Sequence, residues 1–389
     1  MSNSTPLYGQ ILAFLRQYSC AQDLRHFKTL AWMVSALVGS GQLNLAAWEP
    51  YVLSRATQAQ SLERRWRRFL SNERVSITRM YVPLVLAALR DWHSHRLYLA
   101  LDTTLLWGRY CMIHLSVVCC GRAVPFLWRV LEHNSASVAF EAYQPLLRKA
   151  RWLLRQHPDV MLLADRGFAN HDLMGWLQSS PWHYCLRLPC DVLLQGVSKY
   201  PTVIRTVYPP VGTARLYRQV RLWADGEYRC NLVLATVAGS RESWAVATDE
   251  SPTLQTLWQY ALRFQVEELF LDSKSGAFAL EASRLRSHVL LERLYLIAAL
   301  ALLYATTQGM SVQLAGLRQQ VDPHWRRGIS YLKIGLRWLQ GVVHKGRQLL
   351  NPVPLLPVDG HPCFASHRSE QAFYDRIWFT RIRSLTCKA

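Results

Sequence analysis

The sequence predicts a mixed α/β fold, in which helical regions flank a central domain built from strands and helices. Three observations predict it. Residues 1–98 repeat apolar side chains at spacings of three and four, as amphipathic helices do. From about residue 96, the apolar runs have strand length and are separated by glycine-containing turns. With 389 residues, 50% of them hydrophobic, the chain can bury a large core and form more than one domain.

The N-terminal region, residues 1–98, contains a strongly basic helix. Helices are expected over Ile11–Tyr18, Leu24–Val38 and Ser61–Leu70. In the last of these, Trp66 and its apolar neighbours face a core, while four arginines cover most of the opposite side: Arg64, Arg65, Arg67 and Arg68. We interpret this face as one that binds DNA phosphates. A solvated basic surface is the alternative.

The central domain begins with three strands and continues with alternating helices and strands. The expected order is strands over 97–106, 111–120 and 123–131, a helix over 140–155, a strand over 160–164, a helix over 171–178 and a strand over 182–188. This is the order of a ribonuclease-H-like domain, which requires one more helix.

A β-rich insertion delays that final helix. Residues 192–249 form alternating segments with several glycines, and helical periodicity resumes over Leu254–Leu271. We therefore predict three regions. They are a helical DNA-binding region at 1–98, a ribonuclease-H-like catalytic domain at 99–305 that contains the insertion, and a basic C-terminal region at 306–389.

The charge of the chain indicates a polyanionic partner. It has 45 Lys and Arg against 26 Asp and Glu, a net charge of +19. Residues 1–98 hold 12 basic and 5 acidic side chains and residues 306–389 hold 12 and 4, so these flanks contribute +7 and +8. Such an excess favours nucleic acid, because cationic side chains that bind phosphates release condensed counterions. A basic protein without a nucleic acid partner is the alternative.

Cysteine spacing and hydropathy bear on the cellular location. The nine cysteines include no Cys-x-x-Cys pair, and the N-terminus lacks the charged and apolar parts of a signal peptide. The longest apolar stretch, Leu294–Ala305, has 12 residues, which is short for a membrane span and typical of a buried helix. We expect a cytoplasmic protein with no membrane association.

Two aspartates stand on neighbouring predicted strands. Asp102 interrupts the apolar run over 97–106, where a carboxylate is costly to bury unless it is paired or binds a metal. Asp165 ends the strand over 160–164 and begins a turn at the edge of the sheet where α/β folds tend to bind ligands. Either residue alone has an ordinary structural explanation, but their strands are adjacent in the predicted order.

The final helix supplies a third carboxylate, Glu267. At about 100° per residue in an α-helix, this glutamate shares one narrow face with three other polar residues: Tyr260, Arg263 and Lys274. Glu268 lies off that face and is a weaker candidate, as are three acids near other segment ends: Asp172, Asp191 and Asp249.

The three selected carboxylates predict a metal-dependent reaction. Hard oxygen donors without cysteine or histidine suit Mg²⁺ or Mn²⁺. Two such ions about 3.5–4 Å apart activate a water or a 3′-hydroxyl and stabilise the leaving oxygen in phosphodiester displacement. We therefore predict these catalytic metal ligands: Asp102, Asp165 and Glu267.

The chain resembles bacterial insertion-sequence transposases of the DDE superfamily. More narrowly, it resembles the insertion sequence 4 family, whose mark is Tyr-x2-Arg-x3-Glu-x6-Lys, and the spacing from Tyr260 to Lys274 matches it without a gap. Four other segments have the family's form: Leu101–Thr104, Gly121–Pro125, Asp165–Phe168 and Arg64–Asn72. The resemblance covers roughly residues 60–300.

This resemblance implies roles for the site residues. The three carboxylates would hold two Mg²⁺ or Mn²⁺ ions, and Tyr260, Arg263 and Lys274 would bind phosphates near the transposon end. Trp244 lies in the strand context where characterised relatives stack a tryptophan on a flipped base. A core tryptophan is the other interpretation of Trp244.

The implied reaction is nicking at the transposon ends, attack by the freed 3′-hydroxyl and strand transfer into target DNA, by cut-and-paste through a hairpin. Because two ends must be joined, a homodimer on DNA is expected. Basic segments at His324–Arg327 and Arg376–Arg383 would serve dimerisation or end binding. The alternatives are a catalytically silent, transposase-derived DNA-binding protein and a ribonuclease-H-like nuclease without strand transfer.

Overall fold

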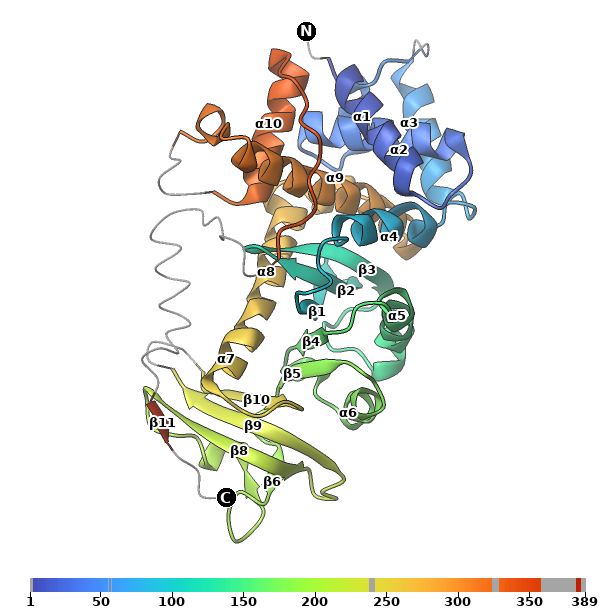
Figure 1. The fold of residues 1–389 in the computed structure, drawn as a ribbon. Coiled ribbons are helices and arrows are strands. Elements are labelled where there is room, and N and C mark those ends of the chain that lie inside the picture. The colour runs from blue at the N-terminus through green and yellow to red at the C-terminus, as the bar shows by residue number, and fades with distance from the viewer. Residues whose placement is uncertain are drawn as a thin grey trace. The chain divides into compact units, whose positions relative to one another are not determined.

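The computed structural model describes residues 3–54, 56, 58–237, 242–323, 329–357 and 383–385 (Figure 1). The chain forms two compact units, each discontinuous in sequence. The first comprises residues 1–94, 104–135 and 266–367, and the second comprises residues 95–103, 136–265 and 368–389. The predicted division into three consecutive regions stays a prediction. Both helical flanks contribute to the first unit.

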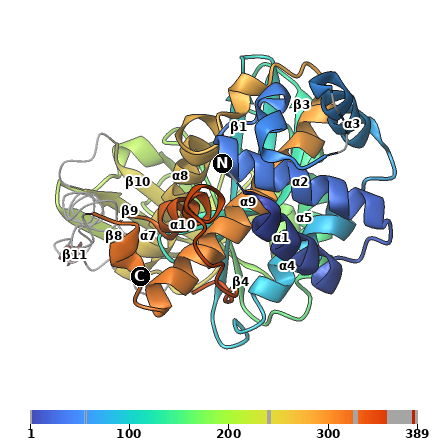
Figure 2. The same cartoon turned by 90° about the horizontal axis from the view of Figure 1, so that it is seen from above.

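The first unit is built around one long apolar helix, α9 (His288–Leu314). Every residue from Leu294 to Val312 is buried, as expected for a helix that is apolar on all sides. Its neighbours are α2, α3, α4, α10 and β3, and Figure 2 shows the helices gathered around it. By length and composition α9 would also pass as a membrane span, but 78% of its most apolar window is buried within the protein.

The other elements of the first unit follow the predicted order. Its helices are α1 (Thr5–Tyr18), α2 (Leu24–Ser40), the 3₁₀ helix Leu45–Tyr51, α3 (Ala59–Ser71), α4 (Ile77–Ala88) and α10 (Tyr331–Lys345). Strands β2 (Tyr110–Cys119) and β3 (Arg122–Glu132) form an antiparallel hairpin in this unit. The predicted boundaries of both strands are correct to within one residue.

Helices α9 and α10 cross at two glycines. A Cβ atom on Gly309 would lie 1.8 Å from the Tyr331 carbonyl oxygen, and one on Gly335 would lie 1.7 Å from the Ala305 carbonyl oxygen. Contacts this short are impossible for a side chain, so only glycine allows the two backbones to approach so closely.

The second unit contains a mixed sheet with the strand order β1-β4-β5-β10-β9-β8-β6-β7. Strand β1 (Leu97–Leu106) begins in this unit, and β1, β4 (Val160–Ala164) and β5 (His183–Arg187) are parallel. The antiparallel remainder comprises β6 (Leu193–Gln195), β7 (Thr202–Val203), β8 (Thr213–Leu222), β9 (Tyr228–Thr236) and β10 (Trp244–Thr248). The short strand β11 (Arg383–Leu385) pairs with β8.

Helices cover both faces of the parallel strands in this unit. In Figure 1, α5 (Phe140–Leu153) and α6 (His171–Gln178) lie on one side of β4 and β5, and α7 (Leu254–Ala261) lies on the other. The mixed α/β fold is therefore confirmed, as is the β-rich insertion between β5 and α7. The parallel order β1-β4-β5 agrees with the ribonuclease-H-like order expected from the sequence.

The segment that carries the polar quartet is less regular than predicted. In place of one helix over 254–271, α7 is followed by the 3₁₀ turn Leu262–Phe264, by α8 (Gln265–Leu271) and by the π-helical turn Asp272–Gly276. Lys274 therefore lies on the π turn, so the angles calculated for a continuous α-helix do not apply to it. Such π turns occur frequently at functional sites.

Candidate active site

The carboxyl ends of three adjacent strands hold two aspartates and an arginine. Strands β1 and β4 are paired so that Leu101 is opposite Ala164, and the next residues are Asp102 and Asp165. In the β4–β5 register, the corresponding residue of β5 is Arg187. Neighbouring strands are about 4.8 Å apart, and residues in register point to the same face. The register therefore places these three residues in a row.

Two residues of the predicted quartet contact the aspartates. Arg263 Nη1 lies 2.6 Å from Asp102 Oδ2, and the Tyr260 hydroxyl donates a hydrogen bond of 3.0 Å to Asp165 Oδ1. The side chains of Arg263 and Asp102 are only 5% and 15% exposed. The ion pair is thus largely removed from water, which makes each partner costly to leave alone.

The surroundings of Asp165 favour its ionised form. Burial raises the pKa of this carboxyl, but the Arg263 charge, the backbone N–H of Arg166, the Tyr260 hydroxyl and the Arg187 charge lower it, and the net pKa is below its ordinary value. Burial also raises the pKa of Tyr260, which keeps the phenol a neutral donor. The site therefore presents ionised oxygen atoms at neutral pH.

A network around Arg187 was not predicted from the sequence. The Arg187 side chain is 12% exposed, its Nη1 lies 4.0 Å from Asp165 Oδ1, and its Nη2 lies 2.5 Å from Glu242 Oε2. Arg166 contacts the same Glu242 oxygen at 3.3 Å. The signal in the sequence was a lone arginine at the end of the apolar run over 182–188, on the strand that follows the one ending at Asp165.

The other half of the quartet belongs to the first unit. Glu267 is an exposed residue of α8, and Lys274 Nζ donates a hydrogen bond of 2.6 Å to the Leu105 carbonyl oxygen. The rejected acid Glu268 forms an ion pair of 2.9 Å with Arg122. Glu267 as third metal ligand stays a prediction.

Asp102 and Asp165 fit a divalent cation by the chemistry of their donors. Both are carboxylates at strand ends, and hard oxygen ligands suit Mg²⁺ or Mn²⁺. Their oxygens are already engaged, because Asp102 Oδ1 accepts the Thr103 N–H at 2.8 Å and its Oδ2 contacts Arg263. A metal ion at Asp102 must therefore compete with Arg263 for the carboxylate or share it.

The side chain of Trp244 is buried. It is 6% exposed, and its ring lies edge-on to Tyr260, with centroids 5.3 Å apart, and 5.7 Å from Phe264. This packing supports the interpretation of Trp244 as a core residue of the site. Stacking on a base, which stays a prediction, would require the indole ring to move.

The basic helix α3 has the two faces expected of it. Trp66 is fully buried, whereas Arg64, Arg67 and Arg68 are exposed. Arg65 is half-buried and donates a hydrogen bond of 3.2 Å to Thr29, so it also serves packing. DNA binding by these four arginines stays a prediction. The C-terminal segment over 324–327 lies outside the described residues, as does nearly all of the segment over 376–383.

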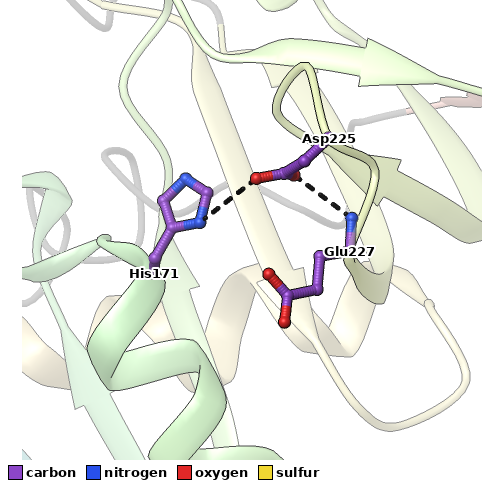
Figure 3. A group of neighbouring side chains, drawn as sticks. All are labelled: His171, Asp225 and Glu227. Carbon is purple, nitrogen blue, oxygen red and sulfur yellow. Dashed lines mark hydrogen bonds and ion pairs between the residues drawn. The ribbon is translucent and has the colours of Figure 1, made fainter.

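A second cluster of possible metal ligands consists of His171, Asp225 and Glu227 (Figure 3), whose ligand atoms lie within 4.8 Å of one another. His171 begins α6, stacks on Trp223 with ring centroids 3.9 Å apart, and lies 3.6 Å from Asp225 Oδ2. Asp225 Oδ1 accepts the Glu227 N–H at 3.2 Å. This cluster contains none of the predicted ligands. It ties the start of α6, six residues after Asp165, to the β8–β9 turn.

Comparison with known proteins identifies the family. Residues 107–304 match the family described as Transposase DDE domain, a range that includes Asp165 and Glu267 and begins five residues after Asp102. No curated protein matches the chain. One similar solved structure is the cryo-EM structure of a piggyBac transposase synaptic complex with hairpin DNA, at 11% identity and a TM-score of 0.40, covering 89% of this chain and 82% of that one. Because the family match spans more than half of the 389 residues, the chain belongs to the Transposase DDE domain family.

Proposed function

We propose that this protein is an insertion-sequence transposase of the insertion sequence 4 family, acting in the cytoplasm on the ends of its own element. It cleaves those ends with the help of divalent metal and joins them to target DNA. The observation that carries the proposal is the row of Asp102, Asp165 and Arg187 at three adjacent strand ends. The family match and the net charge of +19 support it.

The carboxylates have one task in this proposal. Asp102 and Asp165, joined by Glu267, hold two Mg²⁺ or Mn²⁺ ions. When bound, these ions supply charge stabilisation at the scissile phosphate and a more acidic attacking hydroxyl or water. The ionised state of Asp165, supported by its neighbours, suits such a ligand.

The basic and phenolic residues have a second task, which is to hold the DNA end. Arg263 and Tyr260 contact the two aspartates, Asp102 and Asp165. The guanidinium and the hydroxyl would also donate to phosphate oxygens of the DNA end, for which the arginine fork is well suited. Lys274 contributes a point charge to the same strand. Three residues of the quartet thus hold DNA, and the fourth, Glu267, holds metal.

The proposal includes a homodimer that synapses two transposon ends and a hairpin intermediate on the cut-and-paste route. The test uses the full chain with Mg²⁺ or Mn²⁺ and DNA that carries the element's own terminal inverted repeats. Nicked, hairpin and strand-transfer products are expected in that order. Folded protein that binds these ends and never cleaves them would contradict the proposal and favour a silent DNA-binding protein. Cleavage without joined products would favour a nuclease.

Glu267→Gln tests the third metal ligand. We expect it to abolish cleavage and leave DNA binding largely intact, because one carboxylate charge is removed from the metal site. Glu268→Gln is the matched control, since it changes the next residue and breaks only the ion pair with Arg122. Cleavage that survives Glu267→Gln and is lost in Glu268→Gln would reverse the assignment.

A further inference from the structure

The turn between β1 and β2 has an unusual residue at its tip. Trp107 and Gly108 both have positive φ, 50° and 63°, and the Arg109 N–H donates to the Leu106 carbonyl oxygen at 3.1 Å. This is a two-residue hairpin turn of type I′, which favours Asn-Gly or Asp-Gly. An aromatic residue in the left-handed region is strained. Asparagine would therefore adopt this turn with less backbone strain than Trp107 does.

The side chain of Trp107 is also exposed. It is 41% exposed, and its ring lies edge-on to the fully buried Tyr110, with centroids 6.2 Å apart. Beside it, Arg109 is exposed and forms an ion pair of 2.6 Å with Glu132. An exposed aromatic ring next to a cation is a combination with which proteins hold unpaired nucleic acid. The turn geometry does not account for the tryptophan.

The hairpin is anchored by a residue of the quartet. Lys274 Nζ donates to the Leu105 carbonyl oxygen at 2.6 Å, and Leu105 is two residues before Trp107 in the same unit. The proposed function gives Lys274 a phosphate near the transposon end. Trp107 would therefore stand near the DNA backbone that Lys274 contacts.

We propose that Trp107 stacks on a nucleobase of unpaired DNA next to the phosphate assigned to Lys274. The inference rests on the proposed function. It assigns the hairpin tip to base stacking, a contact that tolerates any sequence because every base has a π face. The strained backbone is then retained because the turn keeps the indole ring partly exposed.

The test compares binding of two DNA molecules by fluorescence anisotropy. One is the element's end as blunt duplex, and the other has the same duplex with an unpaired flank at the cleavage position. We expect Trp107→Asn to weaken binding of the flanked DNA by about 5- to 100-fold and that of the blunt duplex less than 2-fold. The slope of affinity against salt should not change, because the indole contacts no phosphate.

Three features of the design keep the result interpretable. Asparagine is favoured at this turn, so Trp107→Asn should retain the fold, and Trp107→Phe should recover most of the affinity. Trp152→Ala removes a tryptophan that is 63% exposed on α5 and should leave both affinities unchanged. An equal loss on both DNA molecules, or no loss on the flanked one, would overturn the inference. Wild-type protein that shows the expected preference but never cleaves would instead contradict the proposed function alone.

Discussion

Arg263 and Asp102 form a buried ion pair across 161 residues of sequence, with 2.6 Å between Nη1 and Oδ2. The arginine comes from the 3₁₀ turn that follows α7, and the aspartate comes from β1. A cation that we propose to contact DNA thus neutralises a predicted metal ligand. The same two residues therefore contribute to the stability of the fold and to the proposed active site.

A double-mutant cycle measures the interaction energy between Arg263 and Asp102. We expect Arg263→Gln and Asp102→Asn each to lower the free energy of unfolding by about 3 kcal/mol, because each breaks this buried ion pair. The double variant should lose much less than the sum of the two. Urea unfolding followed by circular dichroism provides the measurement. The exposed pair Glu63 and Arg67 on α3 is the control, with coupling near zero. Strict additivity at Arg263 and Asp102 would refute the coupling.

Arg187 should act as a positioning residue. We expect Arg187→Gln to reduce cleavage about 10- to 100-fold and to raise the Mg²⁺ concentration needed for half-maximal rate, because Asp165 loses a neighbour that orients it. Arg187→Lys should restore part of the rate. The control is Arg166→Gln, which removes a more exposed contact to the same Glu242 oxygen. A loss of rate without any shift in Mg²⁺ dependence would indicate that Arg187 contacts only DNA.

The glycine crossing between α9 and α10 predicts a large asymmetry among glycine substitutions. Gly335→Ala should lower the free energy of unfolding by about 3 kcal/mol, because its Cβ would collide with the Ala305 carbonyl oxygen. Gly9→Ala, in α1 with no atom within 4 Å of the added Cβ, should raise it by about 0.5–1 kcal/mol. Thermal unfolding of both variants provides the comparison, and equal effects would contradict this helix packing.

Buried His114 predicts a specific pH dependence. Burial, helped by the Lys274 charge, lowers its pKa from 6.5 to about 3. Between these values the unfolded chain binds the proton and the folded protein does not, so stability is complete above pH 6.5 and decreases as the pH falls toward 3. From pH 6.5 to 5 this residue should cost about 2 kcal/mol. His114→Phe, which retains ring contacts to Phe270 and Tyr295, should remove that contribution. Identical pH profiles of stability for wild type and His114→Phe would exclude this contribution of His114.

Much of the fold was predictable because its signals are local. The apolar runs predicted the bounds of β1 and β4 to the residue. Asp102 and Asp165 were selected because each is a charged residue inside such a run or directly after it. Strand order then brought the two acids together. Burial of Trp66 on α3 followed from helical period alone.

The remainder depends on tertiary contacts that no local pattern encodes. Arg187 joins the site only through the register of β5 with β4, and Arg263 lies on a 3₁₀ turn where the sequence predicts a continuous α-helix. The π turn at Lys274 likewise has no sequence signature that separates it from an α-helix. The sequence pattern therefore identified most residues of the site, but the contacts between them depend on the backbone conformation.

The insertion begins and ends beside Arg187. Strand β5 ends at Arg187 and leads into the insertion, while Val246 of the returning strand β10 pairs with that same residue. Changes of length in the insertion that keep this pairing should therefore leave the end of β5 in place. The insertion can be altered independently of the row of strand ends as long as β10 returns to Arg187.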